Sequence, residues 1–157
     1  MAGKIQTHIR TMVYDDIEAV SAIENISFPY PWTQRSFKHE LENDYSINFV
    51  VLHDGVIAGY LCAQEILDEA HILKLALLPQ FRRNGIGTAL FETLLLTLRQ
   101  HHFSGKIFLE ARHSNTPAVD FYKKHGFEVL YARKDYYIKP DEDAIVMMLE
   151  IRNQAMI

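Results

Sequence analysis

Two arginines and two glycines stand close together in the segment FRRNGIGTAL, residues 81–90. Arg82 and Arg83 come just before Gly85 and Gly87, and apolar residues at helical spacing follow. The N-terminus of a helix leaves backbone N–H groups unpaired and carries a partial positive charge, and glycine lets an anion approach closely. Arginine adds charge-assisted hydrogen bonds to phosphate oxygens. The segment therefore predicts a pyrophosphate cradle, and a helix start in which the glycines serve only the turn is the alternative.

This segment differs from two well-known phosphate loops. No Gly-Lys-Ser/Thr follows it, which excludes a Walker loop, and residue 90 is Leu where the dinucleotide fingerprint needs a small residue. The cofactor must therefore be identified from other segments of the chain.

Two later residues carry groups that can move protons. Glu110 ends the apolar stretch KIFLE, and Tyr122 lies seven residues after Asn115 in a helical pattern. A carboxylate can accept a proton, and a phenol with a pKa of about 10 can donate one. The alternatives are a strand-end carboxylate that pairs with Arg112 and a core aromatic. Asn115 is expected to cap its helix, which is compatible with a cofactor contact.

Hydrophobic periodicity predicts the elements that position these residues. Thr33 and Asp15 or Asp16 are expected as N-caps, Gly126 as a helix end, and FPYPW (28–32) as a non-helical segment. Strands are expected at 5–13, on both sides of the turn His53-Asp54-Gly55, and at 70–78, 106–111, FEVLYARK and AIVMMLEI; helices are expected at 14–27, 33–41, 85–102 and 115–125. This order predicts an α/β or α+β domain with helices on both faces of a mixed sheet.

Composition limits the class of protein. The 157 residues suit one domain, 1–157, and the net charge of −4 provides no general attraction for nucleic acid. Cys62 is the single cysteine, lies in an apolar strand and is expected in the core, which argues against a covalent intermediate on its thiol. The start MAGKIQTHIR lacks a signal-peptide core, and no apolar run reaches the roughly 20 residues that span a bilayer. We expect a cytoplasmic protein without a membrane partner. The eight histidines show no metal-ligand spacing, so no metal is expected.

The segment LALLPQFRRNGIGTAL resembles the cofactor motif of the Gcn5-related N-acetyltransferases (GNAT), Arg/Gln-x-x-Gly-x-Gly/Ala. In that family the loop holds the pyrophosphate of acetyl-coenzyme A, and the preceding strand pairs with the pantetheine arm. LEARHSNTPAVDFYKKHGF (109–127) resembles the family's later motif of a strand, an Asn-bearing turn and a Tyr-bearing helix. The order and spacing of the two segments also fit.

A closer resemblance is to the RimI-type ribosomal-protein alanine N-acetyltransferases, through FPYPWTQRSF, LDEAHILKLAL and RKDYYIKPDEDAIVMML, from about Ile9 onward. Asn84 departs from this pattern, which often has a second arginine there. The resemblance implies a GNAT fold: a mixed, mostly antiparallel sheet of about seven strands flanked by about four helices. It also implies direct acetyl transfer from acetyl-CoA to the N-terminal alanine of a small-subunit ribosomal protein. A lysine-side-chain or small-amine acetyltransferase and a non-catalytic acetyl-CoA-binding module are the alternatives.

The resemblance also assigns site residues. It makes Glu110 the general base and Tyr122 the general acid. The residues expected at the cofactor are Leu75, Ala76, Leu77, Arg82, Arg83, Asn84, Gly85, Ile86, Gly87, Thr88 and Asn115. Those expected at the acceptor are Trp32, Glu69, Tyr136 and Tyr137. Asp68 and Glu69 could attract a basic peptide or form a plain acidic turn.

Overall fold

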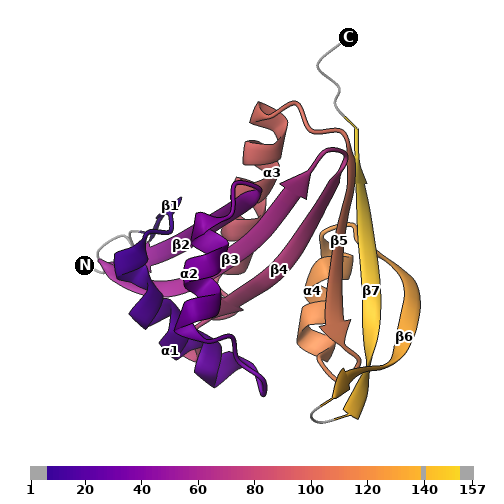
Figure 1. The fold of residues 1–157 in the computed structure, drawn as a ribbon, viewed down its shortest axis with the longest axis horizontal. Coiled ribbons are helices and arrows are strands. Elements are labelled where there is room, and N and C mark those ends of the chain that lie inside the picture. Colours follow the sequence, from indigo (N-terminus) through magenta and orange to yellow (C-terminus); the bar gives the residue numbers. More distant parts are fainter. Residues whose placement is uncertain (1–6, 139–140, 153–157) are drawn as a thin grey trace.

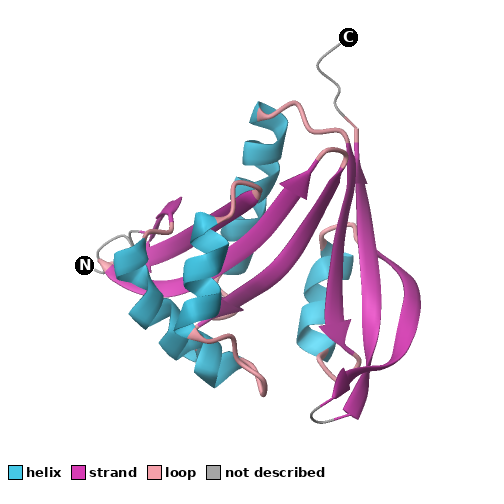
Figure 2. Ribbon diagram, in the orientation of Figure 1, coloured by secondary structure: helices cyan, strands magenta, loops and turns pink. Residues whose placement is uncertain are grey.

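A computed structural model gives the structure of the chain and describes residues 7–138 and 141–152. These residues form one seven-stranded sheet of order β1-β2-β3-β4-β5-β7-β6 and four α-helices (Figures 1 and 2). The strands are β1 (Thr7–Thr11), β2 (Ser46–His53), β3 (Val56–Ile66), β4 (Glu69–Leu77), β5 (Gly105–Arg112), β6 (Glu128–Ile138) and β7 (Asp141–Ile151). The helices are α1 (Ile17–Ser27), α2 (Gln34–Glu42), α3 (Ile86–Gln100) and α4 (Thr116–Lys124). The mixed, mostly antiparallel sheet expected from the sequence is confirmed, because β4 and β5 pair in parallel and the other neighbouring strands pair antiparallel.

The helices cover both faces of the sheet, as Figure 2 shows, and each face has its own core. Tyr60 and Leu61 are adjacent on β3, so their side chains point to opposite faces of the sheet. Leu61 packs in the cluster that contains the apolar stripe of α3, and Tyr60 packs in the cluster that contains α1 and Phe37 of α2. Cys62 is buried in the second cluster, as expected, and burial raises the pKa of its thiol.

The strands β4 and β5 separate after a short pairing, as Figure 1 shows toward the bottom of the view. Their parallel register joins residues 69–72 to residues 106–109 and goes no further. On its other side β4 contains a bulge, because Ile72 pairs with Ala63 and Lys74 pairs with Cys62, which leaves Leu73 as an extra residue. Bulges bend a strand. Residues 73–75 and 110–112 line the space between the two halves of the sheet.

Most of the local signals act as expected. Asp54 and Gly55 both have positive φ, 50° and 82°, which is the type I′ geometry favoured in two-residue hairpins. Thr33 caps α2 by accepting from Ser36 N at 3.1 Å. Gly126, with φ of 95°, follows the end of α4.

The start of the first helix differs from the expectation. Residues 14–16 form a 3-10 turn, and the α-helix begins at Ile17. Asp16 makes no side-chain cap for α1; its carboxylate instead accepts from Val13 N at 2.8 Å and from Arg10 at 2.7 Å. Asp16 therefore stands at the N-cap position of α1, as predicted, but its carboxylate does not make the cap hydrogen bond, because it accepts from the Arg10 guanidinium and the Val13 amide instead.

The predicted strand over 5–13 appears as Thr7–Thr11, and residues 5–6 lie outside the described residues. The strand β6 continues beyond FEVLYARK to Ile138. Across residues 7–138 and 141–152, no helix is long and apolar enough to cross a membrane.

Candidate active site

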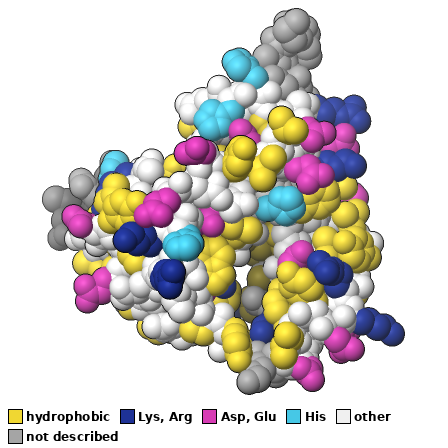
Figure 3. Space-filling view, viewed as in Figure 1, with side chains coloured by type: hydrophobic (Ala, Val, Ile, Leu, Met, Phe, Trp, Pro, Cys, Tyr) yellow, Lys and Arg dark blue, Asp and Glu magenta, His cyan; other side chains and the backbone are white. Residues whose placement is uncertain are grey.

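A pocket of about 940 Å³ opens where β4 and β5 separate. The space-filling view is hollowed between the two halves of the molecule (Figure 3). The walls of the pocket come from the middle of β4, the end of β5, the segment after α1, the helix α4 and the strand β6. The predicted site residues that line it are Trp32, Glu69, Leu75, Glu110, Asn115, Tyr122, Tyr136 and Tyr137.

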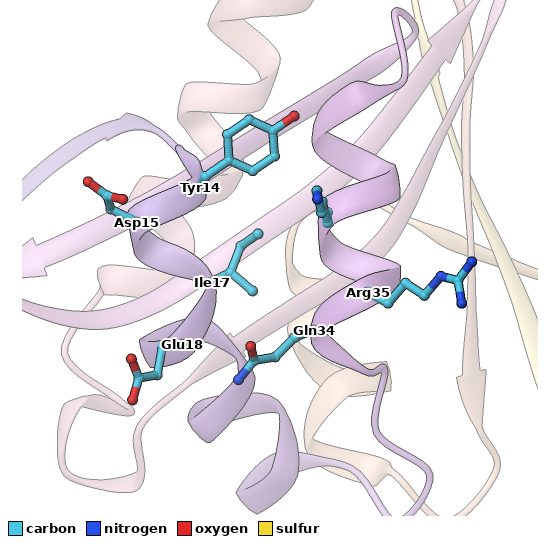
Figure 4. Close-up of a pocket in the computed structure, with 7 residues that line it drawn as sticks. Tyr14, Asp15, Ile17, Glu18, Gln34 and Arg35 are labelled. Atoms are coloured by element: carbon cyan, nitrogen blue, oxygen red, sulfur yellow. The ribbon is translucent and has the colours of Figure 1, made fainter.

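A second pocket, of about 800 Å³, lies between α1 and α2 on the outer surface (Figure 4). It is lined by Tyr14, Asp15, Ile17, Glu18, Gln34, Arg35 and Lys38. No predicted site residue is among them, so the predicted site residues that line a pocket all lie in the first one.

The glycine segment forms the start of α3, as predicted. Ala89 N donates to the Gly85 carbonyl at 3.0 Å, so the helical hydrogen bonds of α3 begin at Ala89. The backbone amide groups of the residues before Ala89 lie ahead of these bonds, at the N-terminus of the helix. Gly85 has a φ of 77°, which glycine adopts without the steric cost that a side chain brings. A Cβ on Gly87 would lie 3.4 Å from the Phe121 ring and 3.7 Å from the Leu77 side chain. The first turn of α3 therefore lies next to the end of β4 and the helix α4 at Gly87, which has no side chain.

Other side chains of this segment have specific contacts. Arg82 Nε donates to the Leu77 carbonyl at 3.1 Å, while Arg83 and Asn84 are exposed. Thr88 Oγ1 lies 3.0 Å from His125 Nε2 at the end of α4. Ala76, Leu77 and residues 82–88 stand outside the lining of the 940 Å³ pocket. The structure thus places the predicted cofactor residues in two groups, one in the pocket and one at the end of β4 and the start of α3.

Glu110 lies on the open side of β5. The strand alternates, so Ile107, Leu109 and Ala111 are buried in the core under α3 while Glu110 faces the pocket. The Glu110 side chain is 37% exposed, and Arg133 Nη1 approaches its Oε1 at 3.7 Å. A hydrogen bond to the Glu110 carboxylate raises the pKa of the Tyr136 phenol. The Glu110 carboxylate is therefore accessible from the pocket, and it interacts with Arg133 and Tyr136 of β6.

Arg112, two residues further along β5, faces the same side. Its Nη1 lies 3.5 Å from Glu142 Oε2, and its guanidinium stands 4.2 Å from the centre of the Tyr137 ring. Burial, together with the nearby Glu110 charge, raises the pKa of Tyr137 to about 12. Tyr137 is therefore protonated at neutral pH. It forms part of the pocket wall, and its hydroxyl can donate a hydrogen bond there.

Tyr122 packs in the hydrophobic core and also lines the pocket. Its ring lies 5.1 Å from Phe121 and 5.3 Å from Phe127, centre to centre, and the residue is 7% exposed. Burial raises the pKa of its phenol, so the group keeps its proton and can act as a donor. Asn115 begins the same helix, where its Oδ1 accepts from Ala118 N at 3.3 Å, and it also lines the pocket.

Sequence reasoning missed several pocket residues. Phe28, His71 and Lys74 line the pocket, and Lys74 forms an ion pair with the fully buried Glu24. A charged residue on the apolar stripe of a helix was the available signal, because Glu24 follows Val20 by four residues. Within residues 7–138 and 141–152, no three His, Cys, Asp or Glu side chains gather closely enough to hold a metal ion.

The family model described as "Acetyltransferase (GNAT) family" matches residues 17–127, well over half of the chain. The chain belongs to the GNAT acetyltransferases. It is 38% identical over 149 residues to a Bacillus subtilis relative, covering 94% of this chain and 98% of the other. The name of that relative provisionally assigns it as a ribosomal protein bS18-alanine N-acetyltransferase.

Solved structures of GNAT proteins share the fold. The ribosomal-protein-S18-alanine N-acetyltransferase from Escherichia coli matches with a TM-score of 0.86 at 30% identity, covering 96% of this chain and 97% of the other. Arabidopsis thaliana NAA60 in complex with acetyl-CoA matches with a TM-score of 0.84 at 17% identity, covering 93% of this chain and 100% of the other. The GNAT membership and fold expected from the sequence are confirmed, and with them the activity class of an acetyltransferase.

Proposed function

We propose that this chain is an N-terminal acetyltransferase that transfers the acetyl group of acetyl-CoA to the α-amine of an N-terminal alanine of a small-subunit ribosomal protein. The observation that carries the proposal is the pocket between β4 and β5, which brings Glu110 and Tyr122 together in a GNAT chain. Relatives at 30% to 38% identity, named for this reaction, support the choice of acceptor. An acceptor of this kind implies a cytoplasmic enzyme.

The residues at the start of α3 fit a pyrophosphate. The first-turn amides of α3 point out of the helix, and Gly87 leaves room beside Leu77 and Phe121. Arg82 and Arg83 are exposed cations at the same helix entrance, where they suit phosphate oxygens. We assign acetyl-CoA to residues 82–88, with the 75–77 backbone and Asn115 along its path. When bound, it supplies a thioester-activated acetyl group.

Proton transfer falls to Glu110 and Tyr122. An α-amine has a pKa of about 7.7–8.0, so a sizeable minority is already neutral near pH 7, whereas about one lysine in a thousand is. A carboxylate of modest basicity therefore suffices for an N-terminus, and Glu110 takes the amine proton directly or through water. Tyr122, whose pKa is raised by burial, holds a proton that it can give to the departing thiolate.

A pair of peptides tests the acceptor. One has a free alanine N-terminus, and the other is the same peptide blocked there and carrying an accessible lysine. Mass spectrometry of products after incubation with acetyl-CoA should show faster acetylation of the free N-terminus. Faster modification of the blocked peptide would replace the N-terminal assignment with a lysine acetyltransferase. Acetylation of polyamines but of neither peptide would identify a small-amine enzyme.

A further inference from the structure

A fully buried carboxylate on α1 connects three elements beside the pocket. Glu24 is 0% exposed, and its carboxylate accepts from Lys74 Nζ of β4 at 2.8 Å and from the backbone N–H of Trp32 at 2.8 Å. The Tyr60 hydroxyl of β3 donates to the same carboxylate. A buried charge is tolerated when it is paired and its remaining lone pairs accept hydrogen bonds, as they do here.

The bulge in β4 explains how Lys74 reaches this carboxylate. Leu73 is the extra residue of the bulge, so it and Lys74 both turn toward the face that α1 and α2 cover. There Lys74 Nζ stands 3.9 Å from the centre of the Phe28 ring and 5.3 Å from that of Trp32. The Lys74 side chain is only 13% exposed. A cation over aromatic rings is attracted to them most strongly when it is removed from water.

The segment 28–32 is held at both ends by Glu24. The Phe28 N–H donates to the Glu24 backbone carbonyl at 3.0 Å, and the Trp32 N–H donates to its carboxylate. This segment has no helix or strand of its own, and it contains Pro29 and Pro31, which have no N–H to donate. Its aromatic side chains nevertheless line the pocket. The Glu24–Lys74 pair is therefore the structural connection between this wall and the strand β4.

We propose that Lys74 is a positioning residue for the acceptor, which holds the wall formed by residues 28–32 against the pocket through its ion pair with Glu24 and its contact with Phe28. This inference rests on the proposed function, because it assigns that wall to the acceptor peptide. The predicted signature is selective: loss of the pair should raise the KM for the peptide and leave kcat and the KM for acetyl-CoA nearly unchanged.

The test uses the double variant Glu24→Gln/Lys74→Met. Removing one partner alone would leave an uncompensated buried charge, whereas this pair of changes removes both charges and keeps the side-chain sizes. We expect the peptide KM to rise roughly tenfold, the scale of a desolvated cation–π contact, and kcat to change less than about threefold. The matched control is Arg10→Met/Asp16→Asn, which removes an ion pair of 2.7 Å whose residues do not line the pocket.

A second measurement does not depend on activity. Trp32 is the only tryptophan of the chain, so its fluorescence reports the position of segment 28–32. In Glu24→Gln/Lys74→Met, we expect the emission to shift to longer wavelength and acrylamide quenching to increase, and in the control variant we expect neither. If the wild-type enzyme acetylates no peptide, the proposed function fails, and the fluorescence comparison still decides whether the pair holds the segment.

Unchanged Trp32 fluorescence or an unchanged peptide KM in the folded double variant would overturn the proposal. An equal rise of the peptide KM in the control variant would also overturn it. Should the double variant not fold, Phe28→Leu provides the same test, because it removes the ring next to Lys74 and leaves the ion pair in place. We expect Phe28→Leu to raise the peptide KM several-fold, and a value within twofold of the wild type would contradict the inference.

Discussion

Arg133 Nη1 of β6 lies 3.7 Å from Glu110 Oε1 of β5, so a cation stands beside the carboxylate that we propose as the base. The Arg133 guanidinium also lies 4.4 Å from the centre of the Tyr136 ring, and the pKa of Tyr136 is raised mainly by its hydrogen bond to Glu110. Both members of the ion pair are partly exposed, and such pairs contribute about 0–1 kcal/mol. An incoming amine can therefore replace Arg133 at Glu110 at little cost.

Replacing the proposed base should slow the reaction in a pH-dependent way. For Glu110→Gln we expect kcat/KM for an alanine peptide to fall by about 10²–10⁴ at pH 7, the usual contribution of a positioned base. The loss should be smaller near pH 9, because the α-amine, with a pKa of about 7.7–8.0, is then already neutral. Steady-state rates at the two pH values measure this, with Glu150→Gln, an exposed carboxylate on β7, as the control. A loss that does not diminish at high pH would argue against a base role.

The phenol of Tyr122 should matter for turnover more than for folding. We expect Tyr122→Phe to lose about 10²–10⁴ in kcat, because the ring contacts with Phe121 and Phe127 remain while the proton donor is removed. Thermal unfolding should be close to that of the wild type. Tyr45→Phe, which changes an exposed tyrosine, is the control. Turnover within a few-fold of the wild type, with chemistry rate-limiting, would leave Tyr122 a core residue only.

Substitutions at Gly87 separate bulk from charge in the cofactor cradle. A Cβ there would lie 3.4 Å from the Phe121 ring, so Gly87→Ala should fold and bind acetyl-CoA with modestly lower affinity. Gly87→Glu adds a negative charge where we place the pyrophosphate and should weaken binding far more. Calorimetric titration with acetyl-CoA compares the two. Equal affinities of the folded Glu and Ala variants would exclude this placement.

The fold could be predicted largely from local signals. Some signals depend only on local backbone geometry and can be recognised in the sequence alone. They are the Asp54-Gly55 turn, the Thr33 cap and Gly126 at the end of a helix. Asp16 takes the predicted N-cap position of α1 without the cap hydrogen bond, because its carboxylate pairs with Arg10 of the neighbouring strand. Short-range rules rank Asp as a helix cap but say nothing about a cation that tertiary structure brings to it.

The position of a residue at the pocket could be predicted where the residue stands in a motif, but not where it depends on the register of the sheet. Glu110, Tyr122 and the glycine segment stand in recognisable patterns, and the structure places the first two in one pocket. The Lys74 contact with Glu24 depends on the β4 bulge, which changes the face to which Lys74 points. A one-residue change of register is not visible in the residue pattern, so this part of the pocket required the structure.

The Arg10–Asp16 contact should make stability depend on pH. The side-chain hydrogen bond from Arg10 holds the pKa of Asp16 below its ordinary value. A carboxyl with a lowered folded-state pKa contributes stability that is present above its unfolded pKa of about 3.9 and is lost as the pH falls through the folded value. We expect Asp16→Asn to be less stable by about 1–3 kcal/mol at pH 7 and by a smaller amount at a pH below the unfolded value of about 3.9. Urea unfolding at both pH values checks this, and a difference that is undiminished in acid would refute the charge-based explanation.

Salt should weaken recognition of a basic acceptor tail. Glu69 and Glu142 line the pocket, and Asp68 is exposed next to Glu69, so carboxylates stand at the pocket where the acceptor is proposed to enter. Attraction between exposed charges is screened over about 10 Å at 0.1 M salt and about 3 Å at 1 M. We therefore expect the KM for an alanine peptide with a basic tail to rise with salt, while a peptide with a neutral tail keeps its KM. In Glu69→Gln the salt dependence should be smaller than in the wild type, whereas Glu128→Gln, an exposed change outside the pocket, should leave it unchanged. The same salt response for basic and neutral tails would show that the acidic residues do not select the acceptor.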